Sequence, residues 1–446
     1  MAEFLIIGAD AAGLSAALQI KRKRSAAEVK VVAKGRIISY GACGIPYVLS
    51  GEIASPDKLV NFTSKGFQEK TGIVVETGRE AVGLDPERRE VEVKDLDSGV
   101  IRHEPYGRLL IATGAEPKRL PFLDHSLEGV FNLHTVEDLN RIMAFIAAKE
   151  PRRAAIIGAG NIGLELAESL SRRGLAYSLV DVLDSPIATW PVFSQKAVLA
   201  KIKDKGVDFR PGTAIASIEK RGEEFILHAE KEDLRADIIF SVTGTKPSTG
   251  FCGGKLETLP NGAILTDSRA RTSVPDIFAA GDCAAVLHRV LGRPAYIPLG
   301  STANKVGRLA GMNMVGAEVE FPGVVGTQIF KFFDLSLART GLGLEEALQA
   351  GFQAEAVSSR ANDRSGYYPG AAQVEVEIVF DRPSGRLLGA AAASRVNAAQ
   401  FIDPAAMAVS AGLTVRDLAW FDAAYAPPYA PVWNALVSAA FQAARF

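Results

Sequence analysis

The residue best suited to redox chemistry in this 446-residue chain is Cys43, within "SYGACGIPYVLSG" at residues 39–51. Its immediate surroundings are small residues, which leave the sulfur accessible: Gly41, Ala42 and Gly44. Pro46 follows closely, and proline favours the first turn of a helix. A helix N-terminus lowers the pKa of a nearby thiol and makes it a better nucleophile. The plain alternative is that Cys43 is only a small residue that packs well.

The other cysteines and the composition limit what kind of protein this can be. Cys252 and Cys283 lie far from Cys43, with neither metal-ligand nor disulfide-framework spacing, so we expect no metal site and a reducing cytoplasm. The 50 Lys and Arg residues balance 51 Asp and Glu, which argues against a nucleic-acid or anionic-membrane surface. No apolar run reaches the length of a membrane span. We therefore expect neither nucleic acid nor membrane as a partner.

Cys43 must be positioned by the elements around it, and the first of these is a glycine turn at residues 8–13, "GADAAG". An apolar strand precedes the turn and a helix follows it, so the segment can hold a dinucleotide pyrophosphate at the helix N-terminus. Gly8 and Gly13 match the fingerprint, but Asp10 replaces its middle glycine. Ala33 stands where the next strand would end in an acid.

A second glycine turn, "GAGNIG", is complete, with Gly158, Gly160 and Gly163. Asp181 ends the next strand, about 20 residues further along. An acid there accepts hydrogen bonds from a ribose 2′-hydroxyl and repels a 2′-phosphate. The turn therefore predicts a nicotinamide site that favours NADH, with NADPH still possible.

Two nucleotide units, the first interrupted by the second, suggest a flavin that exchanges electrons with a nicotinamide. Three shorter segments support this hypothesis: "ATGAEP" at 112–117, "VTGTKP" at 242–247 and "AAGDCA" at 279–284. With these motifs the sequence resembles the flavin-dependent pyridine nucleotide-disulfide oxidoreductases, over essentially the whole chain. In that family the aspartate of the last motif hydrogen-bonds the flavin ribityl chain, so the resemblance gives this role to Asp282.

The resemblance implies an α/β fold of two Rossmann-like nucleotide-binding domains and a C-terminal α+β dimerisation domain. The expected limits are 1–115 and 246–320 for FAD, 116–245 for NAD(P)H, and 321–446 for dimerisation. The residues expected to bind the two cofactors are Gly8, Ala9, Ala12, Gly13, Lys34, Ala112, Thr113, Gly114, Gly281 and Asp282 for FAD, and Gly158, Gly160, Ile162, Gly163, Asp181 and Gly244 for the nicotinamide.

Within the family the chain resembles the branch that uses one redox cysteine, because Cys43 has no near cysteine partner. Oxidases and peroxidases of that branch typically carry a His where this chain has Ala11, as CoA-disulfide reductases do. The segment "AAYAPPYAPVWNAL" also resembles CoA-disulfide and persulfide reductases, whose C-terminal tyrosines approach the redox cysteine of the other subunit. The resemblance thus implies a homodimer in which the tyrosines cross to Cys43 of the partner: Tyr367 (or Tyr368), Tyr425 and Tyr429.

The same relatives bind CoA through basic residues in two segments, so we expect Arg22 and Lys70 to contact CoA, with Ser39 nearby. For a single member of the "KRKR" cluster, a solvated helix end is the stronger alternative. Two residues depart from CoA-disulfide reductases and bear on the substrate. Ala42 replaces a common Asn, and Phe401 replaces a common basic residue.

The leading hypothesis is an FAD-dependent enzyme that passes a hydride from NAD(P)H to flavin and then electrons to Cys43. Cys43 would reduce CoA disulfide, or a CoA persulfide or polysulfide. One alternative is an NADH oxidase that reduces oxygen through a Cys43 sulfenic acid. Another is an electron-transfer reductase for a small redox protein, which would not need Cys43.

Overall fold

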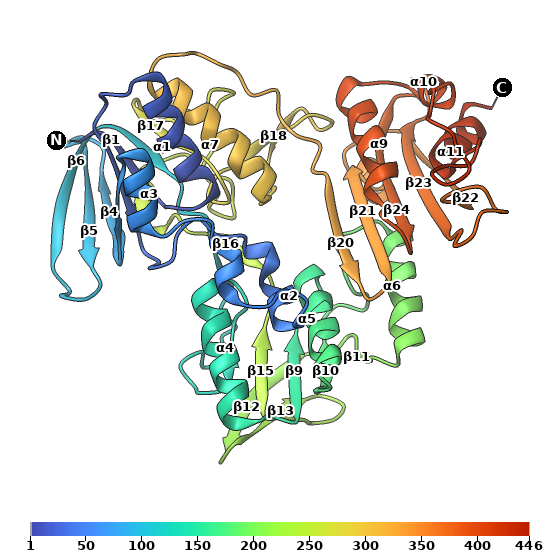
Figure 1. Ribbon diagram of the computed structural model, residues 1–446, viewed down its shortest axis with the longest axis horizontal. Helices are drawn as coiled ribbons and strands as arrows, with labels where there is room; N and C mark the ends of the chain where they lie inside the picture. Colours follow the sequence, from blue (N-terminus) through green and yellow to red (C-terminus); the bar gives the residue numbers. More distant parts are fainter. Residues whose placement is uncertain (1, 446) are drawn as a thin grey trace.

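The computed structural model describes residues 2–445, which form three units (Figure 1). Two units are built on parallel sheets, at the upper left and the bottom of Figure 1, and the third is an antiparallel sheet with helices at the right. The predicted α/β class, with two nucleotide-type units and a C-terminal α+β unit, is confirmed. Among the described residues no helix is both long and apolar enough to cross a membrane.

The first unit holds a seven-stranded sheet, with the N-terminal strand near its centre. Its strands run in the order β3 (Val74–Thr77), β2 (Val29–Ala33), β1 (Ala2–Ile7), β6 (Ile101–Ile111), β5 (Glu90–Asp95) and β4 (Arg79–Asp85), and β17 (Ile277–Ala279) pairs with β6. The end of β6 is parallel to β1 and β17, whereas its start pairs antiparallel with β5. The helices are α1 (Ala11–Lys23), α3 (Ser64–Thr71) and α7 (Gly300–Met314).

The second unit is a parallel sheet inserted after β6. Its strands run in the order β11 (Asp208–Arg210), β10 (Ala176–Val180), β9 (Arg153–Ile157), β15 (Ile238–Ser241) and β8 (Val130–Phe131). The helices are α4 (Val136–Lys149), α5 (Asn161–Arg172) and α6 (Val192–Lys205), and a meander of β12 (Ile215–Arg221), β13 (Glu224–Ala229) and β14 (Leu234–Ala236) packs beside them. The chain enters and leaves this unit through two antiparallel strands, β7 (Ala115–Pro117) and β16 (Thr245–Pro247). The motifs "ATGAEP" and "VTGTKP" therefore lie side by side.

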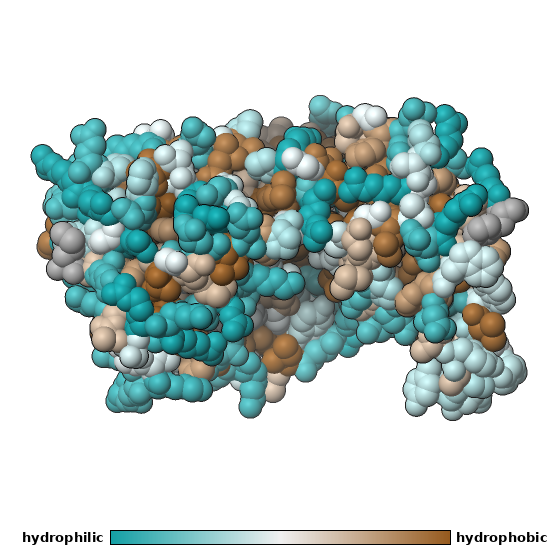
Figure 2. All heavy atoms as spheres, turned by 90° about the horizontal axis from the view of Figure 1, so that it is seen from above, coloured by the Kyte–Doolittle hydropathy of each residue, from teal (hydrophilic) through white to brown (hydrophobic). Residues whose placement is uncertain are grey.

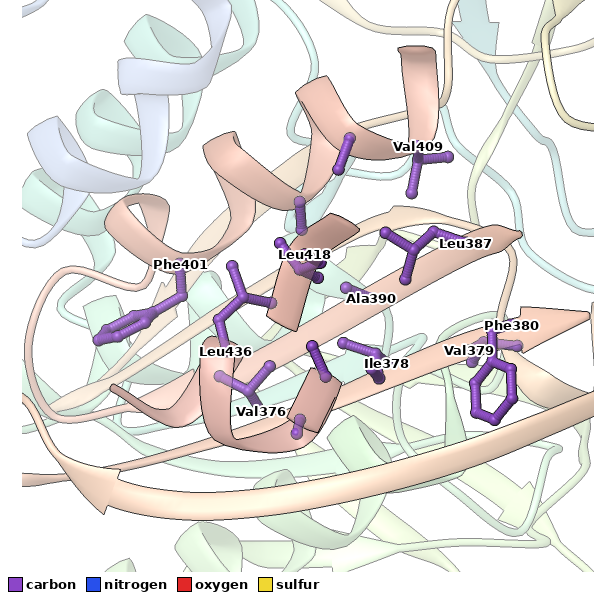
Figure 3. Close-up of a cluster of buried hydrophobic side chains, with 14 of the residues drawn as sticks. Val376, Ile378, Val379, Phe380, Leu387, Ala390, Phe401, Val409, Leu418 and Leu436 are labelled. Carbon is purple, nitrogen blue, oxygen red and sulfur yellow. The ribbon is translucent and has the colours of Figure 1, made fainter. Parts of the chain in front are cut away.

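The third unit is a five-stranded antiparallel sheet covered by helices on one face. The strands run in the order β20 (Gln328–Phe332), β21 (Leu335–Gly341), β24 (Leu387–Ser394), β23 (Gln373–Asp381) and β22 (Ala354–Asn362), and the helices are α8 (Leu344–Gln349), α9 (Ala399–Ala411), α10 (Val415–Ala419) and α11 (Ala435–Ala444). Phe401 is 5% exposed and lies in the apolar core between helices and sheet (Figure 3). Its apolar character is thus explained by packing.

One apolar cluster crosses the predicted domain limits. Ile45 and Leu49 of α2 (Ile45–Leu49) pack in the same cluster as Leu166 of α5 and Phe332 of β20. The remaining short elements are η1 (Ala42–Gly44), η2 (Pro56–Leu59), η3 (Gly250–Cys252), β18 (Val286–His288) and β19 (Arg293–Ala295). Because packing is continuous across the junctions, the limits 1–115, 116–245, 246–320 and 321–446 stay a prediction.

Helix α7 packs on the start of α1 at a glycine. A Cβ added at Gly307 would lie 2.3 Å from the carbonyl oxygen of Ala12, a rigid backbone atom. We expect Gly307→Ala to lower the free energy of unfolding by about 1–3 kcal/mol, because the two helices must separate. Urea unfolding measures the change.

Gly300, in the same helix, is the matched control, since an added Cβ there meets no atom within 4 Å. We expect Gly300→Ala to leave stability unchanged or slightly raised. Equal stabilities for the two variants would contradict the close approach of α1 and α7.

Candidate functional site

Cys43 lies in the η1 turn immediately before α2, with Gly44 as the N-cap residue of the helix and Pro46 in its first turn. The predicted helix start after Cys43 is therefore correct. The side chain is exposed, whereas Cys252 and Cys283 are buried, and none of the three forms a disulfide. Of the three thiols, only Cys43 can meet a substrate or a cofactor without a change in the core.

The segment before Cys43 is tied by its backbone to the first glycine turn. Ser39 adopts a left-handed conformation with φ 53°, which costs free energy for a non-glycine residue. Its N–H donates to the carbonyl oxygen of Ala9 at 3.2 Å, and its carbonyl oxygen accepts from Asn61 N–H at 2.7 Å. These bonds place Ser39, one of the predicted substrate residues, against the flavin-type turn.

The first glycine turn forms a close-packed cradle with the end of β6. A Cβ on Gly8 would lie 2.0 Å from the carbonyl oxygen of Ala112, and one on Gly13 would lie 1.9 Å from that of Gly8. Only glycine fits at these two positions. Ala9 and Ala12 are buried beside them. The predicted residues Gly8, Ala9, Ala12, Gly13 and Ala112 are therefore brought together.

The second half of this cradle comes from the two later motifs. A Cβ on Gly281 would lie 3.2 Å from the Cβ of Ala12, so "AAGDCA" meets the start of α1. Thr113 Oγ1 donates to the carbonyl oxygen of Ser248 at 2.7 Å. Ser248 follows β16, the strand that returns from the second unit, so this bond ties "ATGAEP", with Gly114, to the end of β16. Burial raises the pKa of Asp282, whose carboxylate accepts no hydrogen bond from any described residue. An unpartnered acceptor of this kind fits the hydroxyl groups of a flavin ribityl chain.

Asp10 is the N-cap residue of α1, but its side chain makes no capping hydrogen bond to the helix. Burial raises its pKa to about 6, and bonds from the backbone N–H groups of Tyr40 and Ala11 oppose the rise. The Asp10 carboxylate therefore faces the Tyr40 segment and does not cap α1. It still places an acid at the turn where a pyrophosphate would lie.

Lys34 follows β2 and is exposed, and its Nζ lies 2.7 Å from Glu80 Oε1. The positive charge of Lys34 is thus paired with Glu80 within the first unit. Of the predicted flavin residues, Lys34 is the one whose charged group already has a partner.

The second glycine turn has the geometry of a nucleotide cradle. A Cβ on Gly163 would lie 1.9 Å from the carbonyl oxygen of Gly158, whereas nothing lies within 4 Å of one on Gly160. Gly160 therefore borders open space, into which a phosphate group fits. Ile162 is 40% exposed on the first turn of α5. Gly244 is exposed, and the hydroxyl of its neighbour Thr243 is buried with no partner among residues 2–445.

Asp181 also has a structural role that the sequence motif does not indicate. Its Oδ2 accepts from Ala159 N–H at 2.7 Å and its Oδ1 from Leu183 N–H at 2.9 Å. The carboxylate therefore holds the glycine turn in place. Each carboxylate oxygen has a second lone pair, so a ribose hydroxyl can still bind.

The electrostatics at Cys43 differ from the expectation of a lowered pKa. Burial raises the pKa of the Cys43 thiol, and the negative charges of Glu165 and Asp282 raise it further. Helix α2 has only five residues, so its dipole is short. Within this chain the surroundings of Cys43 favour the thiol.

Sequence reasoning missed Glu165 and Tyr47, whose side chains hydrogen-bond at 3.3 Å between α5 and α2. The signal available was an acid between two buried leucines, Leu164 and Leu166, on a helix that otherwise packs inward. Nothing in the sequence showed which helix this acid would face.

The predicted tyrosines lie on the third unit and are exposed: Tyr367 at 77%, Tyr425 at 51% and Tyr429 at 79%. The side chains of Ser365 and Tyr425 lower the pKa of the Tyr367 hydroxyl, so Tyr367 and Tyr425 lie close to each other. No contact joins them to Cys43 within the described part of the chain. Trp420, Phe421 and Trp433 are also more than 40% exposed in the same segment. This group of aromatic side chains is typical of a protein–protein interface.

The predicted CoA residues lie on the surface of the first unit. Arg22 is exposed in the last turn of α1, where a cation stabilises the helix dipole. Lys70 lies in the last turn of α3, with its Nζ 4.9 Å from the centre of the Phe62 ring. On the face in Figure 2 hydrophilic and hydrophobic residues are interspersed, consistent with the balanced charge of the chain.

Comparison with known proteins identifies the class that this fold and site define. Residues 2–305 match the family model of the pyridine nucleotide-disulphide oxidoreductases, and residues 327–436 match the dimerisation domain of the same family. The chain belongs to this family. Membership implies FAD and NAD(P)H as cofactors and an oxidoreductase activity, as predicted, and it supplies a dimerisation domain.

Particular relatives are similar along nearly their whole length. A CoA-dependent NAD(P)H sulfur oxidoreductase of Pyrococcus furiosus is 35% identical over 441 residues, 97% of each chain. Coenzyme A disulfide reductase of Staphylococcus aureus is 28% identical over 96% of this chain and 97% of its own.

Two solved structures have the same fold throughout. A water-forming NADH oxidase of Lactobacillus brevis has a TM-score of 0.95 at 30% identity, over 100% of this chain and 98% of its own. An NAD-dependent persulfide reductase from A. fulgidus has a TM-score of 0.94 at 32% identity, over 99% and 83%.

We expect the Asp10 carboxylate at the first glycine turn to weaken the retention of FAD. Because the folded-state pKa of Asp10 is raised to about 6, the neutral form is favoured below that pH and is lost as the pH rises through it. We expect Asp10→Asn to retain FAD better than wild type during dialysis at pH 8, by up to about tenfold in Kd. Flavin absorbance measures the retained fraction.

The difference should shrink below pH 6, where wild-type Asp10 is protonated. Asp97→Asn, which removes an exposed carboxylate from the β5–β6 turn, is the control and should behave like wild type. Equal FAD loss from Asp10→Asn and wild type at pH 8 would show that this carboxylate does not repel the cofactor.

Proposed function

We propose that this protein is an FAD-dependent NAD(P)H oxidoreductase that reduces CoA disulfide, or a CoA persulfide or polysulfide, through Cys43. The observation that carries the proposal is the exposed Cys43 at the start of α2, in a segment bonded to the flavin-type turn. Exposure without a second cysteine nearby fits a single thiol that forms a mixed disulfide with a small substrate. The names of the relatives supply the CoA-linked substrate class.

In this proposal each cradle holds one cofactor. FAD, when bound, accepts a hydride from NAD(P)H and supplies two electrons for the reduction of sulfur. Gly8, Gly13 and the N-terminus of α1 hold its pyrophosphate, and Asp282 orients its hydroxyl-bearing chain. Lys34, Thr113, Gly114 and Gly281 border the same cradle. Gly158, Gly160, Ile162, Gly163, Asp181 and Gly244 hold the nicotinamide nucleotide.

The thiol chemistry needs Cys43 and also groups that do not lie close to Cys43 in the single chain. The thiolate attacks a disulfide sulfur, and the leaving thiol requires a proton. We assign that proton to tyrosines of the second subunit, with Tyr425, Tyr367 and Tyr429 crossing in a homodimer. Their exposure and the dimerisation domain support the assignment. Arg22 and Lys70 have exposed cationic groups for the CoA phosphates, and Ser39 adjoins the sulfur-bearing turn.

The likeness to a water-forming NADH oxidase favours one second candidate, reduction of oxygen through a Cys43 sulfenic acid. Ala11 at the turn speaks against it, because oxidases of this branch typically carry a His there. An electron-transfer reductase for a small redox protein would not need Cys43. We assign the enzyme to the cytoplasm, where three unpaired cysteines stay reduced.

Replacement of Cys43 distinguishes between these candidate functions. We expect Cys43→Ser to lose NADH-dependent CoA-disulfide reduction by at least about 10³-fold, because no other sulfur replaces the nucleophile. Flavin reduction by NADH in stopped flow should stay within about threefold of wild type, since the nicotinamide cradle is untouched. Cys252→Ala, which replaces a buried thiol at 3% exposure in η3, is the control and should keep disulfide reduction.

Full activity of Cys43→Ser toward CoA disulfide would overturn the proposal. Oxygen uptake that disappears in this variant, without any disulfide reduction by wild type, would favour the oxidase. Mass spectrometry of the unreduced wild-type protein gives an independent result, for which we expect a CoA-sized adduct on the peptide that contains Cys43.

Asp181 should set the nicotinamide preference. We expect Asp181→Asn to lower the NADH-over-NADPH ratio of kcat/KM about tenfold, because it removes the charge that repels a 2′-phosphate. The amide oxygen can still accept one backbone N–H, so the turn is preserved better than by alanine. An unchanged ratio would show that the ribose lies elsewhere.

A further inference from the structure

Glu165 belongs to the helix of the second glycine turn, but its carboxylate faces the helix that follows Cys43. The Tyr47 hydroxyl donates a hydrogen bond to Glu165 Oε1 at 3.3 Å. Tyr47 follows Cys43 by four residues in the continuous segment formed by η1 and α2. The charge of Glu165 reaches the Cys43 thiol, where it disfavours the thiolate more than any other charge does.

Helices α2 and α5 are held together by further bonds, so this arrangement is fixed (Figure 1). Ser169 Oγ donates to the carbonyl oxygen of Pro46 at 2.8 Å. The guanidinium of Arg173 donates to the carbonyl oxygen of Leu49 at the other end of α2. A carboxyl on α5 therefore keeps a constant position relative to the turn that carries Cys43.

The groups that face Glu165 come from three elements. Burial raises its pKa to about 7, the hydrogen bond from Tyr47 on α2 lowers it, Glu168 on α5 raises it and Lys331 on β20 lowers it. Lys331 is itself shared, because its Nζ lies 2.8 Å from Glu168 Oε1 and 3.0 Å from Glu52 Oε1. Its positive charge is thus largely used by these partners, which leaves Glu165 able to titrate near neutral pH.

We propose that the charge on Glu165, held in place by the Tyr47 hydroxyl, decides whether the sulfur of Cys43 is a thiol or a thiolate. Ionised Glu165 holds the sulfur as the thiol, and neutral Glu165 permits the thiolate. When Cys43 loses its proton and the carboxylate of Glu165 gains one, the pair keeps a single negative charge. No net charge is then added to the site, which avoids the cost of two adjacent anions. The inference rests on the proposed function only for the redox role of Cys43.

Two groups coupled in this way titrate as a pair. As the pH rises through about 7, Glu165 ionises and the thiolate becomes harder to form. The thiolate fraction of Cys43 should therefore rise with pH, flatten above pH 7 and rise again at higher pH. Without a charge at position 165, a single smooth rise should remain.

The test is the rate of alkylation of Cys43 by iodoacetamide between pH 5.5 and 10, on the reduced holoenzyme, with the labelled peptide quantified by mass spectrometry. The readout needs no substrate, so it stays valid even if CoA disulfide is not the substrate. For Glu165→Gln we expect a single titration and about 3- to 10-fold faster alkylation at pH 8 than in wild type. For Tyr47→Phe we expect the flat region to persist and to begin at higher pH, because the carboxylate loses a donor.

Glu87→Gln, which removes an exposed carboxylate from the β4–β5 turn, is the matched control and should give the wild-type profile. Thermal unfolding and FAD content identify a variant that has lost its fold. If Glu165→Gln does not fold, Tyr47→Phe still tests the proposal. A single smooth titration in wild type, or a Glu165→Gln profile identical to that of wild type, would overturn the proposal.

Discussion

A buried ion pair ties the three units of this chain together. Glu168 is 3% exposed on α5, and its Oε1 lies 2.8 Å from Lys331 Nζ, while its Oε2 accepts from Phe333 N–H at 2.7 Å. Lys331 also binds Glu52, in the segment that follows α2. A buried carboxylate without partners would be very costly, so these donors define where β20 and α2 can sit on α5. The position of Cys43 relative to both nucleotide cradles depends on this junction.

Around that junction the chain keeps negative charge close to a sulfur that must ionise. Burial raises the pKa of Cys43, and the charges of Glu165, Asp282 and Asp10 raise it further. A thiol in this setting stays protonated until a neighbour becomes neutral or a partner subunit and a cofactor complete the site. Under the proposed function, a second subunit completes the site through the dimerisation domain and the exposed tyrosines.

Several features of the site could be read from residue types alone, because they depend on local backbone geometry. Glycine turns between a strand and a helix, such as those at Gly8 and Gly158, form wherever a Cβ would meet a neighbouring carbonyl oxygen. The helix start after Cys43 follows from Pro46 in its first turn. Other local features could be described only from the tertiary structure. The Asp10 carboxylate is turned toward the Tyr40 segment, and Phe401 lies in the apolar core of the third unit.

The sequence by itself determined the family, the two glycine turns and the cysteine to which we assign the redox role, since each is encoded within a few neighbouring residues. Only the tertiary structure decided which distant groups act on that cysteine. Glu165 and Cys43 are more than 100 residues apart in the chain, and the charge of Glu165 reaches Cys43 because α5 packs on α2. The strength of an electrostatic interaction depends on the distance between the charges and on their burial, and neither quantity can be read from the sequence. The cysteine was therefore predictable, and the charges that control it were not.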